Sequence, residues 1–157
     1  MKKTNKTKTS KKWVEIVPYG IIGGMIPSAS TMLFKNKKGE ERFAVWFSEL
    51  QSRIAINQNL HKEKVFNFVQ KILSSAGITP KYCFFIKREQ GRDIVKILFN
   101  GKLKPMEFYA DEVVSFCMVN QCRFFCSPDF FEHHIGGEIP KRFKNISLLG
   151  KAPTYLN

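Results

Sequence analysis

Three apolar, β-rich runs separated by short turn signals occupy residues 81–109 and limit what this chain can fold into. The runs are KYCFFIKR, DIVKILF and KLKPMEFY, and the links between them contain Gln90-Gly91 and Asn100-Gly101. Glycine after a polar residue is typical of tight β-hairpin turns, which need left-handed backbone. The sequence therefore predicts a three-stranded meander. DIVKILF is apolar on both faces, which favours a central strand, and Pro105 favours an edge position for the third strand.

Further β-rich runs precede the meander. Residues 13–17 (WVEIV) alternate between apolar and other side chains, which predicts a strand. Glycines interrupt residues 18–30, where we expect a loop. The runs 31–35 and 42–47 flank a polar link that contains glycine, a pattern typical of a hairpin.

Two helices are expected between this hairpin and the meander. Residues 48–51 (SELQ) match a capping box, which predicts a short helix to about residue 56 that buries Leu50 and Ile54. The clearest helical periodicity covers residues 61–76, and Gly77 follows as a left-handed C-cap. Its apolar positions recur three and four residues apart at Val65, Phe68, Val69, Ile72 and Leu73.

The pattern after the meander completes the fold prediction. Residues 111–119 predict a helix that buries Val113, Val114 and Cys117, and residues 122–126 predict a short strand. Ser127 as N-cap and Pro128 at the first helical position begin a last short helix to about His134. This order of elements predicts an α+β fold, in which three to four helices cover a mixed, largely antiparallel sheet.

Positive charge is concentrated at the beginning of the chain. The net charge is +13, and residues 1–12 contain six lysines and no acid. We expect a disordered basic arm over residues 1–12, one domain over residues 13–135 and a basic tail over residues 136–157. The 15 phenylalanines are enough to build one core. A basic excess favours polyanions such as nucleic acid, although a solubilising arm on a mildly basic protein is an equally simple explanation.

The remaining composition favours a cytoplasmic protein with no membrane partner. No run approaches the roughly 20 apolar residues of a membrane-spanning helix. The first apolar stretch contains Glu15 and Pro18 and is broken by glycines, unlike the apolar core of a secretory signal. The four cysteines lie in apolar stretches, where free thiols behave as small hydrophobes: Cys83, Cys117, Cys122 and Cys126. The last three, with His133 or His134, are possible zinc ligands by residue type, but they lack the tight loops of structural sites, so no zinc is expected.

A series of local sequences in residues 13–134 occurs in a recognisable order. AVWF is a Trp-containing strand, SELQSRIAI begins a short helix, and Leu60-His61 precedes the long helix. After the meander, Tyr109-Ala110-Asp111-Glu112 precedes the apolar VVSFCMVN, followed by CRFFCSP and DFFEHH. This series resembles the bifunctional-nuclease domain family. The family has Arg-Pro-Ser where this chain has Phe108-Tyr109-Ala110, and Thr where it has Leu60.

The resemblance implies cleavage of DNA and RNA, a homodimer, and a site built from Glu49, His61 and Asp111. Phosphodiester hydrolysis commonly uses carboxylates that hold a divalent metal, so Glu49 and Asp111 would bind Mg²⁺ or Mn²⁺ and His61 would act as base. Each residue also has a structural explanation. Glu49 suits the first turn of a helix, Asp111 suits an N-cap, and His61 suits a surface next to Lys62.

The meander also supplies a set of basic side chains that would bind phosphates without chemistry. The predicted nucleic-acid-binding residues are Lys87, Arg88, Arg92, Lys96, Lys102 and Lys104. Solvated lysines on exposed strand faces are the alternative interpretation. The leading functional hypothesis is a nucleic-acid-binding domain with metal-dependent hydrolysis of DNA or RNA. The alternative hypothesis is a non-catalytic regulatory or protein-interaction module that keeps the fold.

Overall fold

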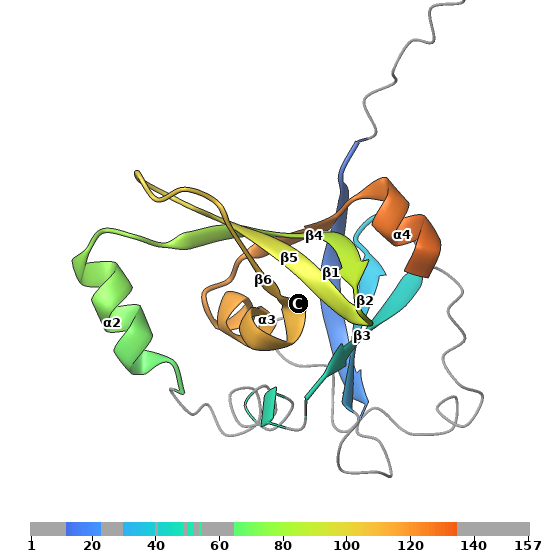
Figure 1. The fold of residues 1–157 in the computed structure, drawn as a ribbon, viewed down its shortest axis with the longest axis horizontal. Helices are drawn as coiled ribbons and strands as arrows, with labels where there is room; N and C mark the ends of the chain where they lie inside the picture. The colour runs from blue at the N-terminus through green and yellow to red at the C-terminus, as the bar shows by residue number, and fades with distance from the viewer. Residues whose placement is uncertain are drawn as a thin grey trace, which may run out of the picture.

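A computed structural model describes residues 12–22, 30–39, 41–48, 50–51, 54 and 65–134, which form a curled seven-stranded sheet with helices (Figure 1). The strands are β1 (Val14–Ile22), β2 (Ser30–Asn36), β3 (Arg42–Phe47), β4 (Pro80–Glu89), β5 (Arg92–Phe99), β6 (Met106–Tyr109) and β7 (Arg123–Cys126). Among the described residues the helices with full bounds are α2 (Asn67–Ser75), α3 (Ala110–Val119) and α4 (Pro128–His134). The α+β prediction is confirmed, and no helix in this part of the chain is long and apolar enough to cross a membrane.

The sheet has the order β3-β2-β1-β7-β4-β5-β6. All neighbouring strands are antiparallel except β4 and β7, which are parallel. The crossover through α3 places β7, the last strand among the described residues, between β1 and β4. This insertion joins the β1–β3 half of the sheet to the β4–β6 meander.

The strand pairings predicted for the hairpins are confirmed, but β6 begins at Met106, so residues 100–105 link β5 to β6 in place of the tight Asn100-Gly101 turn that was expected. β2 and β3 pair across the residue 37–41 link, and β4 pairs with β5, which pairs with β6. Gln90 and Gly91 both have positive φ, 49° and 78°, as a two-residue turn of the hairpin type requires. Gly77 also has positive φ after α2, as expected for a C-cap.

Strand β1 is longer than predicted. It continues through Pro18 and Gly20 to Ile22, so the first part of the expected loop is strand instead. The register between β1 and β2 shifts between Pro18 and Gly20, which leaves Tyr19 as the extra residue of a β-bulge. On its other side, β1 pairs with β7 only from Val14 to Ile16. Pro18, which has no N–H to donate, is tolerated because it lies at the bulge and beyond the β7 pairing.

The core lies between the sheet and the helices α3 and α4. It consists of the inward side chains of the strands together with residues such as Val114 and Cys117 of α3 and Phe130 and Phe131 of α4. Phenylalanine rings dominate it: Phe34 stacks on Phe43 with centroids 5.5 Å apart, and further rings pack edge to face around this pair. Aromatic pairs of this kind stabilise a core by about 0.5–1.5 kcal/mol beyond area burial.

Helix α2 departs from prediction because it stands apart from the sheet (Figure 1). Residues 65–66 form a turn, so the helix begins at Asn67 rather than at His61, and residues 61–64 lie outside the described part. Two contacts join it to α3: the Phe66 ring meets Phe116 at 5.4 Å, and the Gln70 amide donates to Asn120 Oδ1 at 3.3 Å. Its apolar stripe is exposed, with Phe68 at 76%.

The capping-box helix is described only at Leu50, Gln51 and Ile54, all of which are helical. The Gln51 N–H donates to Ser48 Oγ at 3.3 Å, as the capping box predicts. Leu50 is exposed, so the expectation that it is buried is wrong. The rest of the predicted helix lies outside the described residues.

Candidate nucleic-acid interface

Four aromatic side chains gather on the outer face of the sheet, the face opposite α3 and α4. Trp13 meets Phe84 edge to face at 4.9 Å, Phe84 stacks on Phe125 at 5.2 Å with an interplanar angle of 19°, and Tyr82 lies 6.0–6.2 Å from both phenylalanines. Trp13 is 45% exposed and Tyr82 is 38% exposed. We call Trp13, Tyr82, Phe84 and Phe125 the aromatic platform.

Strand pairing explains why these rings meet. Tyr82 and Phe84 are two residues apart on β4, so they share a face, while Cys83 and Phe85 point into the core. In the parallel pairing of β4 with β7, Phe84 stands opposite Phe125. The arrangement continues across the sheet, because Glu15 of β1 stands opposite Phe125 and Lys96 of β5 opposite Phe84.

A three-residue charge cluster borders the platform on the β1 side. Arg123 Nε donates to Glu15 Oε1 at 2.9 Å, and Lys37 Nζ donates to the same oxygen at 3.1 Å. The hydrogen bond from Arg123, together with that from Lys37, outweighs partial burial and lowers the pKa of Glu15. The Arg123 guanidinium also lies 5.3 Å from the centre of the Phe125 ring. Two cations share one carboxylate here, which leaves a local excess of positive charge.

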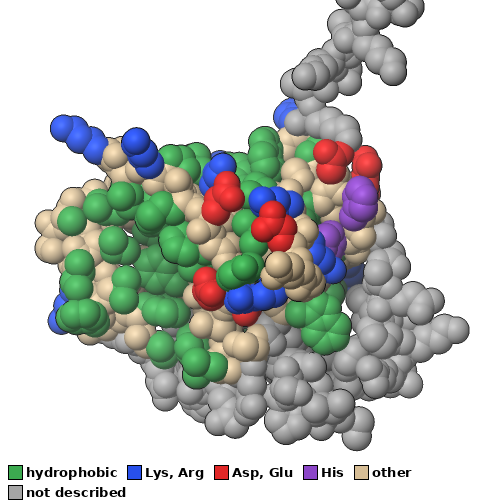
Figure 2. Space-filling view, viewed as in Figure 1, with side chains coloured by type: hydrophobic (Ala, Val, Ile, Leu, Met, Phe, Trp, Pro, Cys, Tyr) green, Lys and Arg blue, Asp and Glu red, His purple; other side chains and the backbone are tan. Residues whose placement is uncertain are grey.

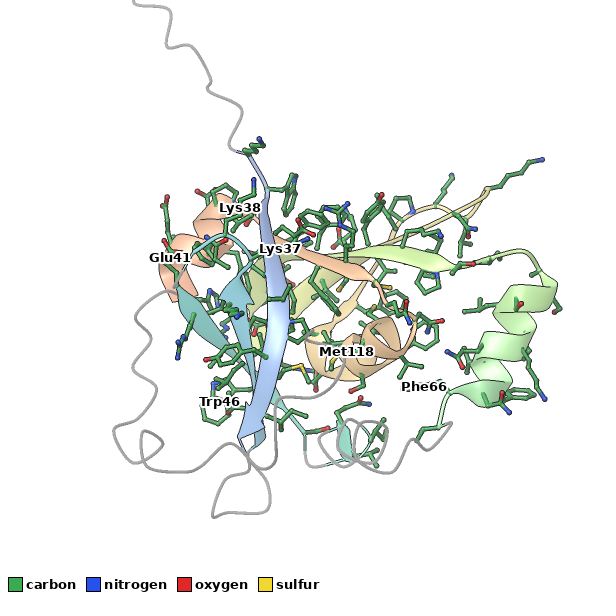
Figure 3. All side chains as sticks on the ribbon, turned by 180° about the vertical axis from the view of Figure 1, so that it is seen from behind. Lys37, Lys38, Glu41, Trp46, Phe66 and Met118 are labelled. Carbon is green, nitrogen blue, oxygen red and sulfur yellow. The ribbon has the colours of Figure 1, made fainter. Side chains whose placement is uncertain are left out.

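The residue 37–41 turn places more charge beside this cluster. Figure 3 shows Lys37 and Lys38 next to β1, with Trp46 toward the opposite end of β3. The Lys37 N–H donates to the Glu15 carbonyl at 3.0 Å, which fixes the turn against β1. Residues 1–11, with five of the arm's six lysines, are joined directly to Lys12 and Trp13.

Most cations predicted to bind nucleic acid are held in ion pairs. Lys87 bonds to Glu89 at 2.5 Å, and Lys96 bonds to Glu107 at 2.9 Å. Acidic and basic side chains accordingly alternate in the middle of the face in Figure 2. Lys102 and Lys104 follow β5, are exposed, and have no carboxylate partner within the described residues. Phosphate binding by these lysines stays a prediction, and Lys87 and Lys96 are already bonded to acids.

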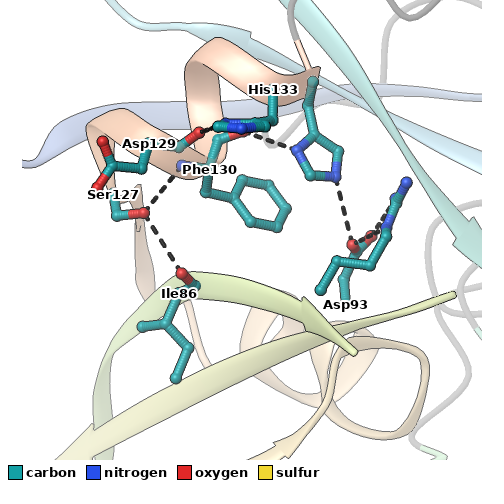
Figure 4. A network of polar contacts seen from close by, with 8 residues as sticks. Ile86, Asp93, Ser127, Asp129, Phe130 and His133 are labelled. Atoms are coloured by element: carbon teal, nitrogen blue, oxygen red, sulfur yellow. Dashed lines mark hydrogen bonds and ion pairs between the residues drawn. The ribbon is translucent and has the colours of Figure 1, made fainter. Parts of the chain in front are cut away.

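Arg88 takes part in a partly buried network instead. Its guanidinium donates to both carboxylate oxygens of Asp93, at 2.7 and 3.1 Å, and the Asp93 side chain is 3% exposed. His134 Nε2 approaches the same carboxylate at 3.4 Å, while its Nδ1 lies 2.7 Å from the Phe130 carbonyl oxygen. Figure 4 shows this network beside α4, with Ser127 Oγ accepting from the Phe130 N–H as the expected N-cap. The Asp93 carboxylate is buried, whereas the Arg88 side chain is 38% exposed, so its guanidinium is occupied by the bidentate ion pair and not by burial.

Arg92 is bonded to the predicted catalytic Asp111. Its Nη2 donates to both Asp111 carboxylate oxygens, at 2.8 and 3.0 Å, and to Glu112 at 3.3 Å. The guanidinium also lies 3.5 Å from the centre of the Tyr109 ring. Tyr109, not Asp111, occupies the N-cap position of α3, so the N-cap interpretation of Asp111 is wrong. Asp111 lies in the first turn, where its charge complements the helix dipole.

Of the three residues predicted to form a catalytic metal site, the described part of the chain contains only Asp111. Glu49 and His61 lie outside it. Asp111 shares its carboxylate with Arg92, and the described residues contain no cluster of three or more potential ligands. Arg92 holds both Asp111 and the neighbouring Glu112, and two carboxylates bonded to an arginine do not by themselves make a metal site, so a site at Asp111 depends on Glu49 and His61.

The four cysteines are free and buried. Cys126 Sγ lies 3.8 Å from the Val14 carbonyl oxygen, and burial raises the pKa of its thiol to about 12. The hydrogen bond with Cys117 and burial raise the pKa of Cys122 far above its ordinary value. The thiols of Cys122 and Cys126 are therefore protonated at neutral pH.

The aromatic platform is the feature that reasoning from sequence missed. The signal was the doubled phenylalanine in KYCFFIKR and CRFFCSP. Because neighbouring strand residues point to opposite faces, one phenylalanine of each pair has to leave the core. Phe85 and Phe124 point inward, and Phe84 and Phe125 form the platform.

Comparison with protein-family models gives no match, and no curated protein is significantly similar in sequence. The candidate interface is therefore defined by its own geometry: a partly exposed aromatic cluster beside a cationic cluster and a lysine-rich arm.

Proposed function

We propose that this chain is a nucleic-acid-binding domain whose interface is the outer face of the sheet around the aromatic platform. The observation that carries the proposal is that Lys37 and Arg123 border the platform and share the single carboxylate of Glu15. In the sequence, the lysine-rich arm ends directly before Trp13, which belongs to the platform and precedes β1. A surface with an excess of positive charge favours the phosphates of nucleic acid, and bases stack on aromatic side chains. We also propose a cytoplasmic location, where free thiols persist.

A binding titration tests this proposal. We expect the full chain to bind a labelled 20-nucleotide oligomer in fluorescence anisotropy, with an affinity that falls as salt rises. The double substitution Lys37→Gln and Arg123→Gln should weaken binding and reduce the slope of log affinity against log salt by about 2, or about 1 per lost phosphate contact. Lys71→Gln, which removes an exposed charge from α2, is the matched control. Absence of binding at about 50 mM salt, where such contacts are strongest, contradicts the proposal.

Hydrolysis of the bound nucleic acid is the second step of the proposal, and it rests on the resemblance to bifunctional nucleases. In this scheme Glu49 and Asp111 would hold Mg²⁺ or Mn²⁺, which would stabilise the charge that develops on the phosphate, and His61 would act as base. Arg92 would have to release one oxygen of Asp111 for a metal to bind there. Cleavage of the oligomer only when a divalent cation is present supports this step, and binding without cleavage removes it.

A protein-interaction module is the alternative function, and the exposed stripe of α2 favours it. Val65, Phe68, Val69 and Ile72 are all 43% exposed or more. Figure 2 shows hydrophobic side chains gathered over the α2 side of the molecule. Exposed apolar patches commonly mark protein interfaces. Sedimentation of the wild type and of Phe68→Ser separates the cases, since a homodimer held by α2 dissociates in the variant.

A further inference from the structure

The aromatic platform has features that charge alone does not require. Four rings pack against one another on the outer face, although the core is complete on the opposite side of the sheet. Trp13 and Tyr82 keep much of their surface in contact with water. A cluster of large, partly exposed rings on a sheet is unfavourable in water unless a partner covers it.

We propose, on the basis of the nucleic-acid binding argued above, that unpaired bases of a single strand stack on the aromatic platform. Trp13 is the outermost acceptor because it contacts the other rings through Phe84 and is the most exposed of the four. Base stacking on aromatic side chains is tolerant of sequence, since every base has a π-face. The platform would therefore distinguish single strands from duplexes without reading the base sequence.

The neighbouring charges fit a single-stranded ligand. Arg123 lies over Phe125 and beside Tyr82 in the β7–β4 pairing, so a base on the rings brings its phosphate toward a guanidinium. Lys37 donates to the same Glu15 carboxylate as Arg123, and Lys12 directly precedes Trp13 in the sequence. In a duplex the faces of the bases are stacked on each other, so the platform would be left uncovered.

Tryptophan fluorescence provides a direct test. The chain has two tryptophans, and Trp46→Phe leaves Trp13 as the only reporter. We expect oligo(dT) of about 15 nucleotides to quench Trp13 fluorescence to saturation, because the stacked base contacts the indole. A hairpin duplex of equal charge should bind through phosphates with far less quenching.

Two matched substitutions locate the effect. Trp13→Ala should weaken oligo(dT) binding by roughly 5- to 150-fold, which corresponds to the loss of one stacked base, and should leave the salt slope unchanged. Trp46→Ala removes an equally exposed tryptophan, at 50% against 45%, that lies outside the platform and should change affinity less than twofold. Thermal midpoints of both variants verify folding.

The possible outcomes distinguish a failure of base stacking from a failure of nucleic-acid binding. If the wild type binds neither single strand nor duplex, the nucleic-acid function itself fails. If it binds both equally and Trp13→Ala binds as the wild type does, the function stands and the stacking platform is refuted. Binding to anionic phospholipid vesicles with a blue-shifted Trp13 emission, and no binding to oligo(dT), assigns the platform to a lipid surface instead.

Discussion

Arg92 and Asp111, nineteen residues apart in the chain, are joined by a bond from one guanidinium nitrogen to both carboxylate oxygens at 2.8 and 3.0 Å. This ion pair connects the beginning of β5 to the beginning of α3 and places an arginine beside the aspartate. In the resemblance described above, the bifunctional-nuclease family has an arginine three residues before that aspartate, where this chain has Phe108. Here the guanidinium comes from a different strand, and the sequence order gave no sign of it.

Asp111→Asn tests whether this carboxylate also acts in hydrolysis. Both partners of the ion pair are partly exposed, so the substitution should lower the free energy of unfolding by about 0–1 kcal/mol. We expect it to abolish cleavage that depends on Mg²⁺ or Mn²⁺, because a carboxamide is a poor ligand for these ions. Gel assays of cleavage, with urea unfolding in parallel, measure both effects. Glu49→Gln should have the same effect, and a folded Asp111→Asn protein with full cleavage clears Asp111 of a catalytic role.

Asp93 should make the stability of the protein depend on acid pH. Burial alone would raise the pKa of this carboxyl, but the contacts with His134 and Arg88 outweigh it, so the pKa lies below its ordinary value. A carboxyl with a lowered folded-state pKa stabilises the fold at pH values above about 4, and this stabilisation is lost as the pH falls through the folded pKa. Urea unfolding between pH 2 and 7, in steps of about one unit, should show the loss.

Asp93→Asn identifies the residue responsible. It leaves Arg88 without its charged partner and should cost roughly 1.5–3 kcal/mol at pH 7, the usual contribution of hydrogen bonds to charged groups. It should also flatten the decline in stability below pH 4. Glu132→Gln on α4, which changes an exposed carboxylate, is the control. An acid profile that stays unchanged in Asp93→Asn contradicts the role given to this network.

The local part of the fold was predictable, and the long-range part was not. Turn chemistry at Gln90-Gly91 and the polar, glycine-containing link between residues 35 and 42 predicted hairpins, because those interactions are close in sequence. The placement of β7 between β1 and β4 depends on a crossover, and nothing local encodes which neighbours a short strand acquires. The periodicity correctly predicted that α2 is a helix with an apolar face. Periodicity does not show which element covers that face, and here the face is exposed.

The candidate site shows the same division. Asp111 was found because an acid at a helix start is visible in sequence, while its partner Arg92 comes from another element. The platform was missed because both phenylalanines of each pair were assigned to the core, although neighbouring strand residues point to opposite faces. Six cations were predicted to bind nucleic acid, and the ion pairs that four of them make with acids were not anticipated.

The cysteines should be unreactive until the protein unfolds. The thiolate is the reactive form, and the raised pKa values of Cys122 and Cys126 keep both thiols protonated at neutral pH. We expect a chromogenic disulfide reagent to label all four slowly in the native protein and rapidly in denaturant. Stoichiometric zinc in the purified protein would instead show that cysteines serve as metal ligands.

Deleting the basic arm should change the salt dependence of DNA binding without changing the thermal stability of the fold. Deletion of residues 2–12 takes away six lysines and ends just before Trp13. We expect the thermal midpoint to change little, because the core lies in the body of the protein, and the salt dependence of DNA binding to flatten as fewer counterions are released. Anisotropy titrations between about 50 and 200 mM salt check this. A truncated protein with the full salt slope would show that the arm makes no phosphate contacts.

Phe84 and Phe85 provide the sharpest test of the two faces of the sheet, because they are neighbours on β4 with opposite environments. Phe85 is fully buried and packs edge to face on Phe34 and Phe43, so Phe85→Ala should cost roughly 3–5 kcal/mol. Phe84 packs on Trp13 and Phe125 at the surface, so Phe84→Ala should cost only about 1 kcal/mol, mainly the lost aromatic contacts. Nucleic-acid binding should respond in the opposite order, with Phe84→Ala impaired while the protein remains folded. Urea unfolding and oligo(dT) titration of the two variants measure both effects. Equal losses of stability in the two variants would mean that Phe84 belongs to a buried layer and that the outer face is not the open platform described above.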